Sequence, residues 1–360
     1  MGARRQQGDA AMPAPWPRDA WYVAGTSDEV GNRPLGRTIC GEPMVLFRHS
    51  AGVSALEDFC PHRGAPLSLG SVQGDTLVCG YHGLAMAANG CTAGMPRQRV
   101  QGFPPIRSFP AAERHGFVWV WPGDPDRADR AAIPHLAWAN SDDWAFGSGR
   151  FRVACDYRLM IDNLMDLTHE TYVHASSIGQ REIDEAPVDT RSDGDEVVTS
   201  RFMHGIEAPP FWKMALRGAG LDDTALVDRW QVCRFSLPSH VLIEVGVALA
   251  GHGGYDAPDH LKVYSIVTDF MTPETEHSHH YFWGMARKFA VGDADLTASI
   301  RDGQHAIFSE DLEILERQQA NLARHPDRRL LKLNIDAGGV KSRMLIDRAV
   351  AAETAALAIV

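Results

Sequence analysis

The sequence has no apolar run long enough to cross a membrane. A spanning helix needs roughly 18–20 consecutive apolar residues, whereas the longest apolar stretch here, residues 245–250, is short and directly follows Glu244. The N-terminus also has no apolar segment typical of a secretory signal. We therefore expect a cytoplasmic protein with no membrane partner.

An excess of basic residues is also missing. The chain has 35 Lys and Arg against 46 Asp and Glu, a net charge of −11, which argues against nucleic acid as a partner. Cysteine is scarce, with six in 360 residues. In a cytoplasmic protein, a cysteine with a nearby histidine is more often a metal ligand than half of a disulfide. Only Cys60 and Cys79 have such a histidine at a suggestive spacing.

These two cysteines lie in a pair of short motifs. Residues 60–64 read Cys-Pro-His-Arg-Gly and residues 79–83 read Cys-Gly-Tyr-His-Gly, so sixteen residues separate His62 from Cys79, and His82 completes the set. Two thiolates and two imidazoles on two loops suit a Rieske-type [2Fe–2S] cluster, whose histidine ligands raise the reduction potential. Structural zinc is the alternative, but zinc fingers usually pair Cys with Cys and His with His. We expect the remaining cysteines to be packed thiols: Cys40, Cys91, Cys155 and Cys233.

A second pair of possible ligands, His169 and His174, lies five residues apart in a stretch with helical character. On a regular helix these side chains would diverge by about 140°. Binding to one metal therefore requires the helix to end or distort near His174, and Gly179 is a plausible stop. Such a pair alone is structural more often than not, but the cluster motif upstream favours a mononuclear iron. That site also needs a carboxylate, as in a 2-His-1-carboxylate triad.

The best carboxylate candidate is Asp311, in a predicted helix around residues 309–319. At about 100° per residue, Asp311 falls near the middle of an inward apolar face, where an acid is costly unless it is paired or bound to a metal. Glu310 falls at the edge of that face. The rest of the prediction places Ile307, Phe308, Ile314 and Leu315 inward, and Glu313 and Glu316 outward. The alternative is a surface acid within a charged run.

Asp166 lies one turn before His169 on the same helix face. Its carboxylate could accept the free N–H of His169 and the N–H of a cluster histidine, and so provide an electron path between the two metals. The alternative is an ordinary acid on a helix face.

The chain divides into a β-rich first part and a mixed second part. Short strand-like runs between Trp21 and about Pro122, at residues 44–48, 76–79 and 117–121, predict a small all-β domain. The Pro/Asp/Arg stretch at residues 122–130 marks its end. Helical stretches near residues 158–174 and 294–324 then occur among further strand-like runs, which predicts an α+β domain. These runs are residues 151–155, 196–202, 241–249, 263–270 and 280–285. The expected domains are residues 18–124 and 125–360, after a mobile tail.

With both motifs established, the chain resembles the Rieske non-haem iron oxygenase family over nearly its full length. The resemblance is strongest to the branch that demethylates vanillate, in residues 163–179, 208–212, 239–246, 281–287 and 333–340. It implies an N-terminal Rieske β domain and a catalytic domain with an antiparallel sheet covered by helices. It implies cluster ligands Cys60, His62, Cys79 and His82, iron ligands His169, His174 and Asp311, a bridging Asp166, and Asn163 close to the iron. Leu84 replaces a tryptophan common after His-Gly, a change familiar in this branch.

The resemblance also implies partners and a reaction. We expect an NADH-dependent flavin/iron–sulfur reductase as electron donor and a head-to-tail homotrimer, in which each cluster serves the iron of the neighbouring subunit. The expected reaction is O-demethylation of a methoxylated aromatic acid, with vanillate giving protocatechuate and formaldehyde. The alternatives are hydroxylation of an aryl methyl group, demethylation of another methoxybenzoate, and an electron carrier without oxygen chemistry.

Residues that contact the substrate or the reductase are less well defined by the sequence. Motif placement suggests Phe211, Trp212, His240, Trp283 and Arg234 as substrate contacts, although core packing or surface pairing explains each equally well. We expect the His277, His279 and His280 group to be exposed rather than a second metal site. Local positive charge on the first domain could attract an acidic reductase, with a merely solvated surface as the alternative; it comes from Arg63, Arg97, Arg99, Arg107 and Arg114.

Overall fold

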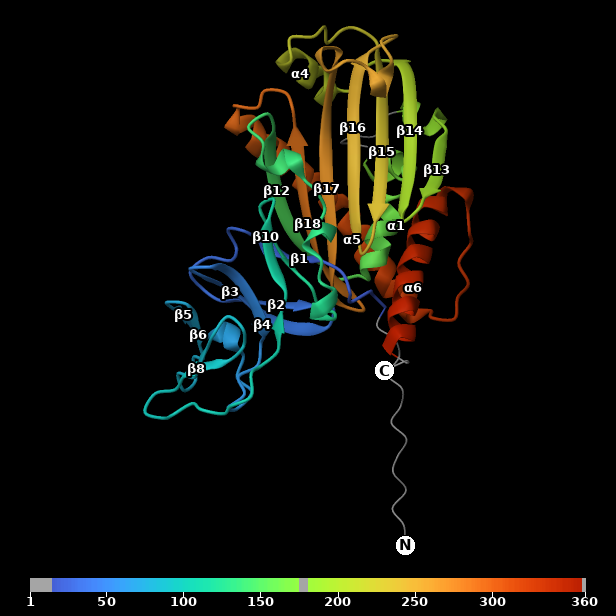
Figure 1. Cartoon of the computed structure of the whole chain (residues 1–360). Coiled ribbons are helices and arrows are strands. Elements are labelled where there is room, and N and C mark those ends of the chain that lie inside the picture. Colours follow the sequence, from blue (N-terminus) through green and yellow to red (C-terminus); the bar gives the residue numbers. More distant parts are fainter. Residues whose placement is uncertain (1–14, 175–180, 358–360) are drawn as a thin grey trace.

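The computed structural model describes residues 15–174 and 181–357 and shows two parts joined side by side (Figure 1). Residues 15–120 form strands, turns and one short 3-10 helix, and a seven-stranded sheet with helices follows. The connection between the two parts, residues 121–144, contains three short 3-10 helices. The predicted boundary at residues 124/125 falls within this connection, and the division itself stays a prediction.

The N-terminal part contains three small antiparallel sheets with strand orders β1-β11-β10, β2-β3-β4-β9 and β5-β6-β7-β8. Strands predicted at residues 44–48, 76–79 and 117–121 match β3, β6 and β11. The strands are β1 (Tyr22–Thr26), β2 (Leu35–Ile39), β3 (Glu42–His49), β4 (Gly52–Glu57), β5 (Ser71–Gln73), β6 (Thr76–Val78), β7 (Ala85–Met86), β8 (Thr92–Gly94), β9 (Ser108–Phe109), β10 (Ala111–Arg114) and β11 (Phe117–Val120).

The second part is organised on one antiparallel sheet with strand order β12-β18-β17-β16-β15-β14-β13. Neighbours along the chain pair as hairpins from β13 to β18, and β12 closes the edge beside β18. The strands are β12 (Ala145–Val153), β13 (Val188–Asp193), β14 (Glu196–Ile206), β15 (Val227–Ser236), β16 (His240–Leu249), β17 (Lys262–Thr275) and β18 (Ser278–Arg287).

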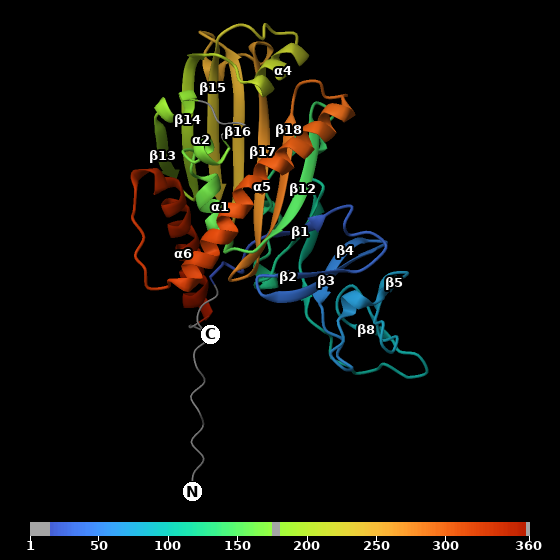
Figure 2. The ribbon, with the colours of Figure 1, turned by 180° about the vertical axis from the view of Figure 1, so that it is seen from behind.

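Helices cover one face of this sheet, as Figure 2 shows for α1, α2, α5 and α6. The N-terminal part packs on the other face, where β1 and β2 contact β17. The helices are α1 (Tyr157–Leu164), α2 (Glu170–Val173), α3 (Arg181–Glu185), α4 (Pro210–Gly218), α5 (Ala294–Arg324) and α6 (Ala337–Leu357). The 3-10 helices are Leu67–Leu69, Pro125–Arg127, Arg130–Ala132, Ala137–Asn140, Gly254–Asp256, Asp259–Leu261 and Asn334–Asp336.

The predicted fold class, an all-β domain followed by an antiparallel sheet covered by helices, is confirmed. No helix in residues 15–174 or 181–357 is both long and apolar enough to cross a membrane. The predicted helix at 294–324 matches α5, whereas the predicted helix near 158–174 is two short helices. In the second part, helices α3, α4 and α6 and strands β13 and β15 were not predicted. The proposed helix stop at Gly179 and the residues before position 15 lie outside the described part of the chain.

Three burial predictions were wrong. Cys91 is exposed in a turn, although Cys40, Cys155 and Cys233 are buried as expected. His279 and His280 are buried, because β18 lies between the helical layer and the N-terminal part and all its residues are buried. Ile314, expected on the inward face of α5, is 49% exposed.

Candidate metal centres

The two cysteine motifs form a matched pair of loops. In the first loop, the Cys60 N–H donates to the Ala65 carbonyl at 2.8 Å and the Gly64 N–H donates to the Cys60 carbonyl at 2.8 Å. Cys79, Gly83 and Leu84 repeat this pattern in the second loop, at 2.8 and 3.0 Å. Gly64 and Gly83 both have positive φ, of 69° and 78°, a conformation that glycine adopts without strain. The spacing read from the sequence therefore corresponds to two equivalent tight turns.

The four candidate cluster ligands divide into a buried thiol pair and an exposed imidazole pair. Cys60 and Cys79 belong to the apolar core of this end of the domain, while the rings of His62 and His82 are exposed with their centroids 4.6 Å apart. A cluster held in this way would have its thiolate side inside the protein and its imidazole side at the surface, where electrons enter and leave. The donor set and the turns therefore fit a Rieske [2Fe–2S] cluster.

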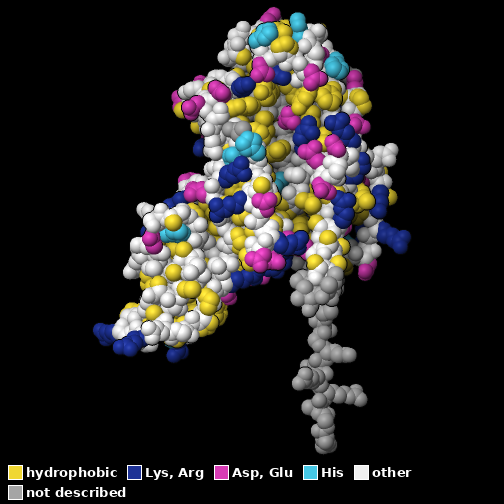
Figure 3. Space-filling view, viewed as in Figure 1, with side chains coloured by type: hydrophobic (Ala, Val, Ile, Leu, Met, Phe, Trp, Pro, Cys, Tyr) yellow, Lys and Arg dark blue, Asp and Glu magenta, His cyan; other side chains and the backbone are white. Residues whose placement is uncertain are grey.

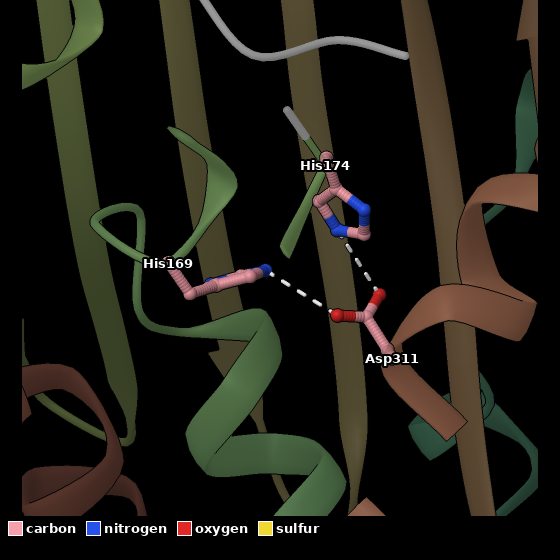
Figure 4. A group of neighbouring side chains, drawn as sticks. All are labelled: His169, His174 and Asp311. Atoms are coloured by element: carbon pink, nitrogen blue, oxygen red, sulfur yellow. Dashed lines mark ion pairs between the residues drawn. The ribbon is translucent and has the colours of Figure 1, made fainter. Parts of the chain in front are cut away.

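The second candidate centre contains His169, His174 and Asp311 (Figure 4). Their ligand atoms all lie within 4.8 Å of one another. His169 Nε2 is 3.6 Å from one Asp311 carboxylate oxygen, and His174 Nε2 is 3.3 Å from the other. Two imidazoles and one carboxylate converging on one point have the composition of a facial triad, which binds Fe(II) and leaves coordination positions open.

A break in the helix brings the two histidines together. Helix α1 ends at Leu164, a turn follows, and α2 extends only from Glu170 to Val173. His169 caps the start of α2 and His174 caps its end, where its φ and ψ of −106° and 29° leave the helical region. The distortion that the five-residue spacing required is therefore present. Asp311 reaches the same point from α5, where its side chain is buried beside Phe308 and Leu315, as its helical position predicted.

Neighbouring groups fix the orientation of each candidate ligand. His174 Nδ1 is 2.6 Å from a Glu310 carboxylate oxygen, and His169 Nδ1 is 2.7 Å from the Asp166 main-chain carbonyl. Both contacts occupy Nδ1 and leave Nε2 facing the centre, as in metal sites where the outer nitrogen donates to an oxygen. Asn163 donates from Nδ2 to Asp311 at 3.0 Å. Glu310 therefore has a role that its position at the helix edge did not suggest.

The charge at this centre favours a bound cation. Burial alone would lower the pKa of His174, but the hydrogen bonds and charges of Asp311 and Glu310 raise this pKa to about 9. Without a metal, a proton on His174 would therefore offset part of the negative charge of Asp311 and Glu310. A bound metal ion would take over this role.

One detail of the Asp166 prediction was wrong. The partner of His169 is the main-chain carbonyl of Asp166, and the Asp166 carboxylate instead accepts the Thr168 N–H and hydroxyl, each at 2.7 Å. The short turn after α1 directs the carboxylate to its own backbone, as acids at helix ends and turns commonly do. A bridging role between subunits is not tested by these contacts and stays a prediction.

A buried polar network supports α2 from the sheet. Gln231 donates to Glu170 at 2.7 Å, and the guanidinium of Arg201 donates to Gln231, lies 3.1 Å from Glu170 and donates to the Leu167 carbonyl at 2.6 Å. All three side chains are at most 5% exposed. Because Glu170 directly follows His169, this network positions that histidine.

The triad lies in the wall of a cavity of about 340 Å³ between the helices and the sheet. This volume is within the usual range for sites of small organic ligands. Its apolar side chains include Phe211, Trp212, Ile243, Val267, Met285 and Phe308, and its polar side chains include Asn163, Arg229 and Gln304. The cavity therefore offers an apolar slot with a few polar groups, beside the candidate metal ligands.

Two of the five predicted substrate contacts, Phe211 and Trp212, line the cavity. The other three do not. His240 packs between Trp119 and Phe270, Trp283 lies in the core behind Phe308, and Arg234 pairs with Glu244 on the opposite face of the sheet. Sequence reasoning missed Arg229, Gln231 and Glu170. The alternation of β15 could have indicated the first two, had that strand been recognised.

Models of two protein families match the chain. The vanillate O-demethylase oxygenase C-terminal domain matches residues 153–352, and the Rieske [2Fe-2S] domain matches residues 20–110. The vanillate O-demethylase oxygenase subunit of Pseudomonas sp. (strain HR199 / DSM 7063) is 64% identical over 339 residues, which are 94% of this chain and 96% of that protein. The subunit of that name from Pseudomonas sp. (strain ATCC 19151) is 68% identical over 319 residues, 88% of this chain and 97% of that protein.

A solved structure has the same architecture. The crystal structure of dicamba monooxygenase with non-heme iron and dicamba superposes with a TM-score of 0.81 at 33% identity, over 94% of this chain and 98% of that one. The likeness therefore extends across both the cluster loops and the helix-covered sheet.

Proposed function

The chain belongs to the vanillate O-demethylase family of Rieske non-haem iron oxygenases, and we propose that it demethylates a methoxylated aromatic acid. The substrate that we propose is vanillate. It is an oxygenase component with a [2Fe–2S] cluster and a mononuclear iron. The observation that carries the proposal is the convergence of His169, His174 and Asp311 on the wall of an apolar cavity, in a chain 64–68% identical to vanillate O-demethylase oxygenase subunits.

In this proposal each metal has a defined set of ligands. Cys60, His62, Cys79 and His82 hold the cluster in the domain of residues 18–124, and His169, His174 and Asp311 hold the iron in the domain of residues 125–360. When bound, the cluster supplies single electrons and the Fe(II) supplies O2 activation. The matched turns around Gly64 and Gly83 and the donor set of the triad support this assignment.

The side chains around the iron site have positioning roles. Glu310 and the Asp166 carbonyl hold the Nδ1 atoms of the two histidines, which keeps each Nε2 directed at the metal. Asn163 restrains Asp311 from the cavity side, while its own Oδ1 is buried with no partner among the described residues. Asn163 is therefore suited to contact O2 or substrate. We propose that Asp166 provides the electron path between this iron site and the cluster of a neighbouring subunit.

The overall reaction removes a methyl group as formaldehyde. The aryl methyl ether, O2, two electrons and two protons give the phenol, formaldehyde and water, with NADH as the source of the electrons through a separate reductase. The carbon of the methoxyl group is oxidised to a hemiacetal, which then breaks its C–O bond to release the phenol. The apolar cavity walls hold the ring and keep bulk water away from the reacting carbon.

Partners follow from the same premise. An oxygenase component of a multicomponent system needs a reductase and a substrate, and we propose a flavin/iron–sulfur reductase that uses NADH. The exposed rings of His62 and His82 support electron entry at the surface of the N-terminal domain. We further propose a head-to-tail homotrimer, because the loops between β4 and β8 lie at the end of the N-terminal part that is remote from α1 and α2 (Figures 1 and 2).

The experiment is a product assay after anaerobic reduction and exposure to O2, with a panel of methoxy- and methylbenzoates. We expect formaldehyde and protocatechuate in equal amounts from vanillate, and none from a His169→Ala variant that still contains the cluster. Hydroxymethyl products from methylbenzoates without formaldehyde from any methoxybenzoate would instead identify an aryl-methyl hydroxylase.

A further inference from the structure

We propose that Arg229 is the residue that binds the carboxylate of the aromatic substrate and thereby selects acids over neutral methoxyarenes. This inference rests on the proposed function and assigns a receptor for one part of the substrate. Among the described residues that line the cavity, Arg229 is the only arginine or lysine. Its side chain is 6% exposed overall, so its charge lies inside the protein rather than at the cavity mouth.

The strand register directs Arg229 into the cavity. Side chains alternate along β15, and Arg229, Gln231 and Cys233 line the cavity on one face of the sheet. Gln231 contacts Glu170, the neighbour of the iron ligand His169, at 2.7 Å. Arg229 lies two residues further along the strand, roughly 7 Å away, about the span of one benzene ring with its substituents. A ring with its methoxyl group at the iron could therefore place a carboxylate at Arg229.

The other charges of the cavity make this cation necessary for an anionic ligand. Asp166, Glu170 and Asp311 line the cavity and would repel a carboxylate. Asp311 faces the two histidines and Glu170 pairs with Arg201 and Gln231, so the charge of these two acids is partly balanced inside the protein. Arg229 is the group of opposite sign on the same wall. Burial lowers its pKa to about 10, against the effect of the Glu170 carboxylate, so it stays protonated at neutral pH.

The chemistry of the guanidinium suits this role. A guanidinium offers five N–H donors in a planar fork, so an interaction with the protein leaves donors for a bidentate contact with a carboxylate. Phe211 and Trp212 on α4 line the same cavity and supply aromatic surface for the ring. A methoxybenzoate would then be held by its ring and its acid group, with the ether left for the iron.

The test compares vanillate with guaiacol, which has the same methoxyphenol ring but no carboxylate. Dissociation constants are measured with the iron-loaded protein, and KM and kcat are measured by formaldehyde release. For Arg229→Met we expect vanillate binding to weaken about 30-fold or more, the usual loss when one partner of a buried charge pair is removed. Guaiacol binding should change by less than about threefold, so the preference for the acid should collapse. Arg229→Lys keeps the charge without the fork and should weaken vanillate binding about tenfold.

The control is Arg234→Met, on the same strand but on the opposite face, where Arg234 pairs with Glu244. This substitution should leave the dissociation constants of vanillate and of guaiacol unchanged. Equal losses for vanillate and guaiacol in the Arg229 variants, or no loss for either, would overturn the assignment. Wild-type protein that binds vanillate but releases no formaldehyde would overturn the proposed reaction alone, and the binding constants would still decide the role of Arg229.

Discussion

At the residue scale, the site depends on contacts that hold the candidate ligands as much as on the ligands. The clearest is the 2.6 Å contact between Glu310 and Nδ1 of His174. A carboxylate there fixes the histidine tautomer and makes Nε2 a stronger ligand. Glu310 is thus expected to set how tightly the iron is held without binding it.

We predict that Glu310→Gln weakens iron binding about 10- to 100-fold, the usual effect of removing such an outer partner. The measurement is the iron retained per chain during titration with a chelator. Glu313→Gln is the matched control, because Glu313 is exposed and pairs with Arg317 one turn away. Equal iron loss in both variants would show that helix charge, rather than the contact with His174, controls affinity.

Asp269 on β17, a fully buried acid, makes the stability of the protein depend on pH. Burial raises its pKa to about 7, although the hydroxyl of Tyr281 donates to it at 2.7 Å. The folded protein therefore keeps a proton that the unfolded chain loses at its ordinary pKa near 4. The contribution of Asp269 to the free energy of unfolding is therefore fully present below pH 4. It is lost as the pH rises from 4 to 7, at a rate of at most about 1.4 kcal/mol per pH unit.

Asp269→Asn should remove this slope. We expect the free energy of unfolding of the variant, measured with urea between pH 4.5 and 7.5, to fall less steeply with pH than that of the wild type. The asparagine can still accept the Tyr281 hydroxyl, so the fold should be retained. Parallel slopes in the two proteins would mean that Asp269 ionises normally in the folded state.

At the element scale, the packing of α6 against α1 supports the turn that leads to the site. A Cβ on Gly338 would lie 2.5 Å from the Met165 carbonyl oxygen and 2.6 Å from Thr199 Oγ1. Met165 directly precedes Asp166, so this close approach fixes the turn that leads to His169. The sequence offered no way to see this role, because α6 follows α1 by well over a hundred residues.

Gly338→Ala should therefore destabilise the protein by about 1–3 kcal/mol, as overpacking does, although alanine favours helices. Urea unfolding measures the change. Gly303→Ala on α5 has no atom within 4 Å of the new Cβ and should stabilise the fold by up to about 1 kcal/mol. If both substitutions stabilise, α6 does not pack against α1 as closely as described.

Site residues set by local sequence patterns could be predicted, whereas those brought together by strand pairing could not. The cluster ligands Cys60, His62, Cys79 and His82 could be predicted from the spacing of their motifs. Asp311 could be predicted from its place on the apolar face of a helix. Arg229 and Gln231, which line the cavity, could not be predicted, because they depend on the pairing of β15 with its neighbours. Arg201 could not be predicted either, because it contacts Gln231 only through the pairing of β14 with β15. His279 and His280 were expected to be exposed because they follow a polar Pro/Glu/Thr loop. Their burial depends on the layers packed on both faces of β18, which the local sequence does not reveal.

At the scale of the whole molecule, charge is distributed unevenly. The protein carries a net charge of −11, yet Arg97 and Arg99 are exposed on the loop after β8, and Figure 3 shows basic side chains at that end of the N-terminal part. Arg63, beside the candidate ligand His62, is exposed as well. Arg107 instead lies 3.6 Å from Glu42, and its charge is partly balanced.

We predict that Arg63→Glu with Arg97→Glu slows reduction by an acidic reductase several-fold at low salt and flattens its dependence on ionic strength. Stopped-flow reduction of the cluster at several salt concentrations measures this effect. Arg348→Glu on α6, remote from the cluster loops, is the control and should leave the rate unchanged. An unaltered salt dependence in the double variant would exclude docking through these arginines.

Iron stoichiometry tests most directly whether one chain holds two unlike iron centres. We predict three irons per chain in the wild-type protein. His169→Ala or Asp311→Asn should lose one of them and leave the spectrum of the cluster intact. Cys60→Ser should instead lose the two cluster irons and keep the third. Two irons per chain in the fully loaded wild-type protein, unchanged by His169→Ala, would contradict the account and leave an electron carrier.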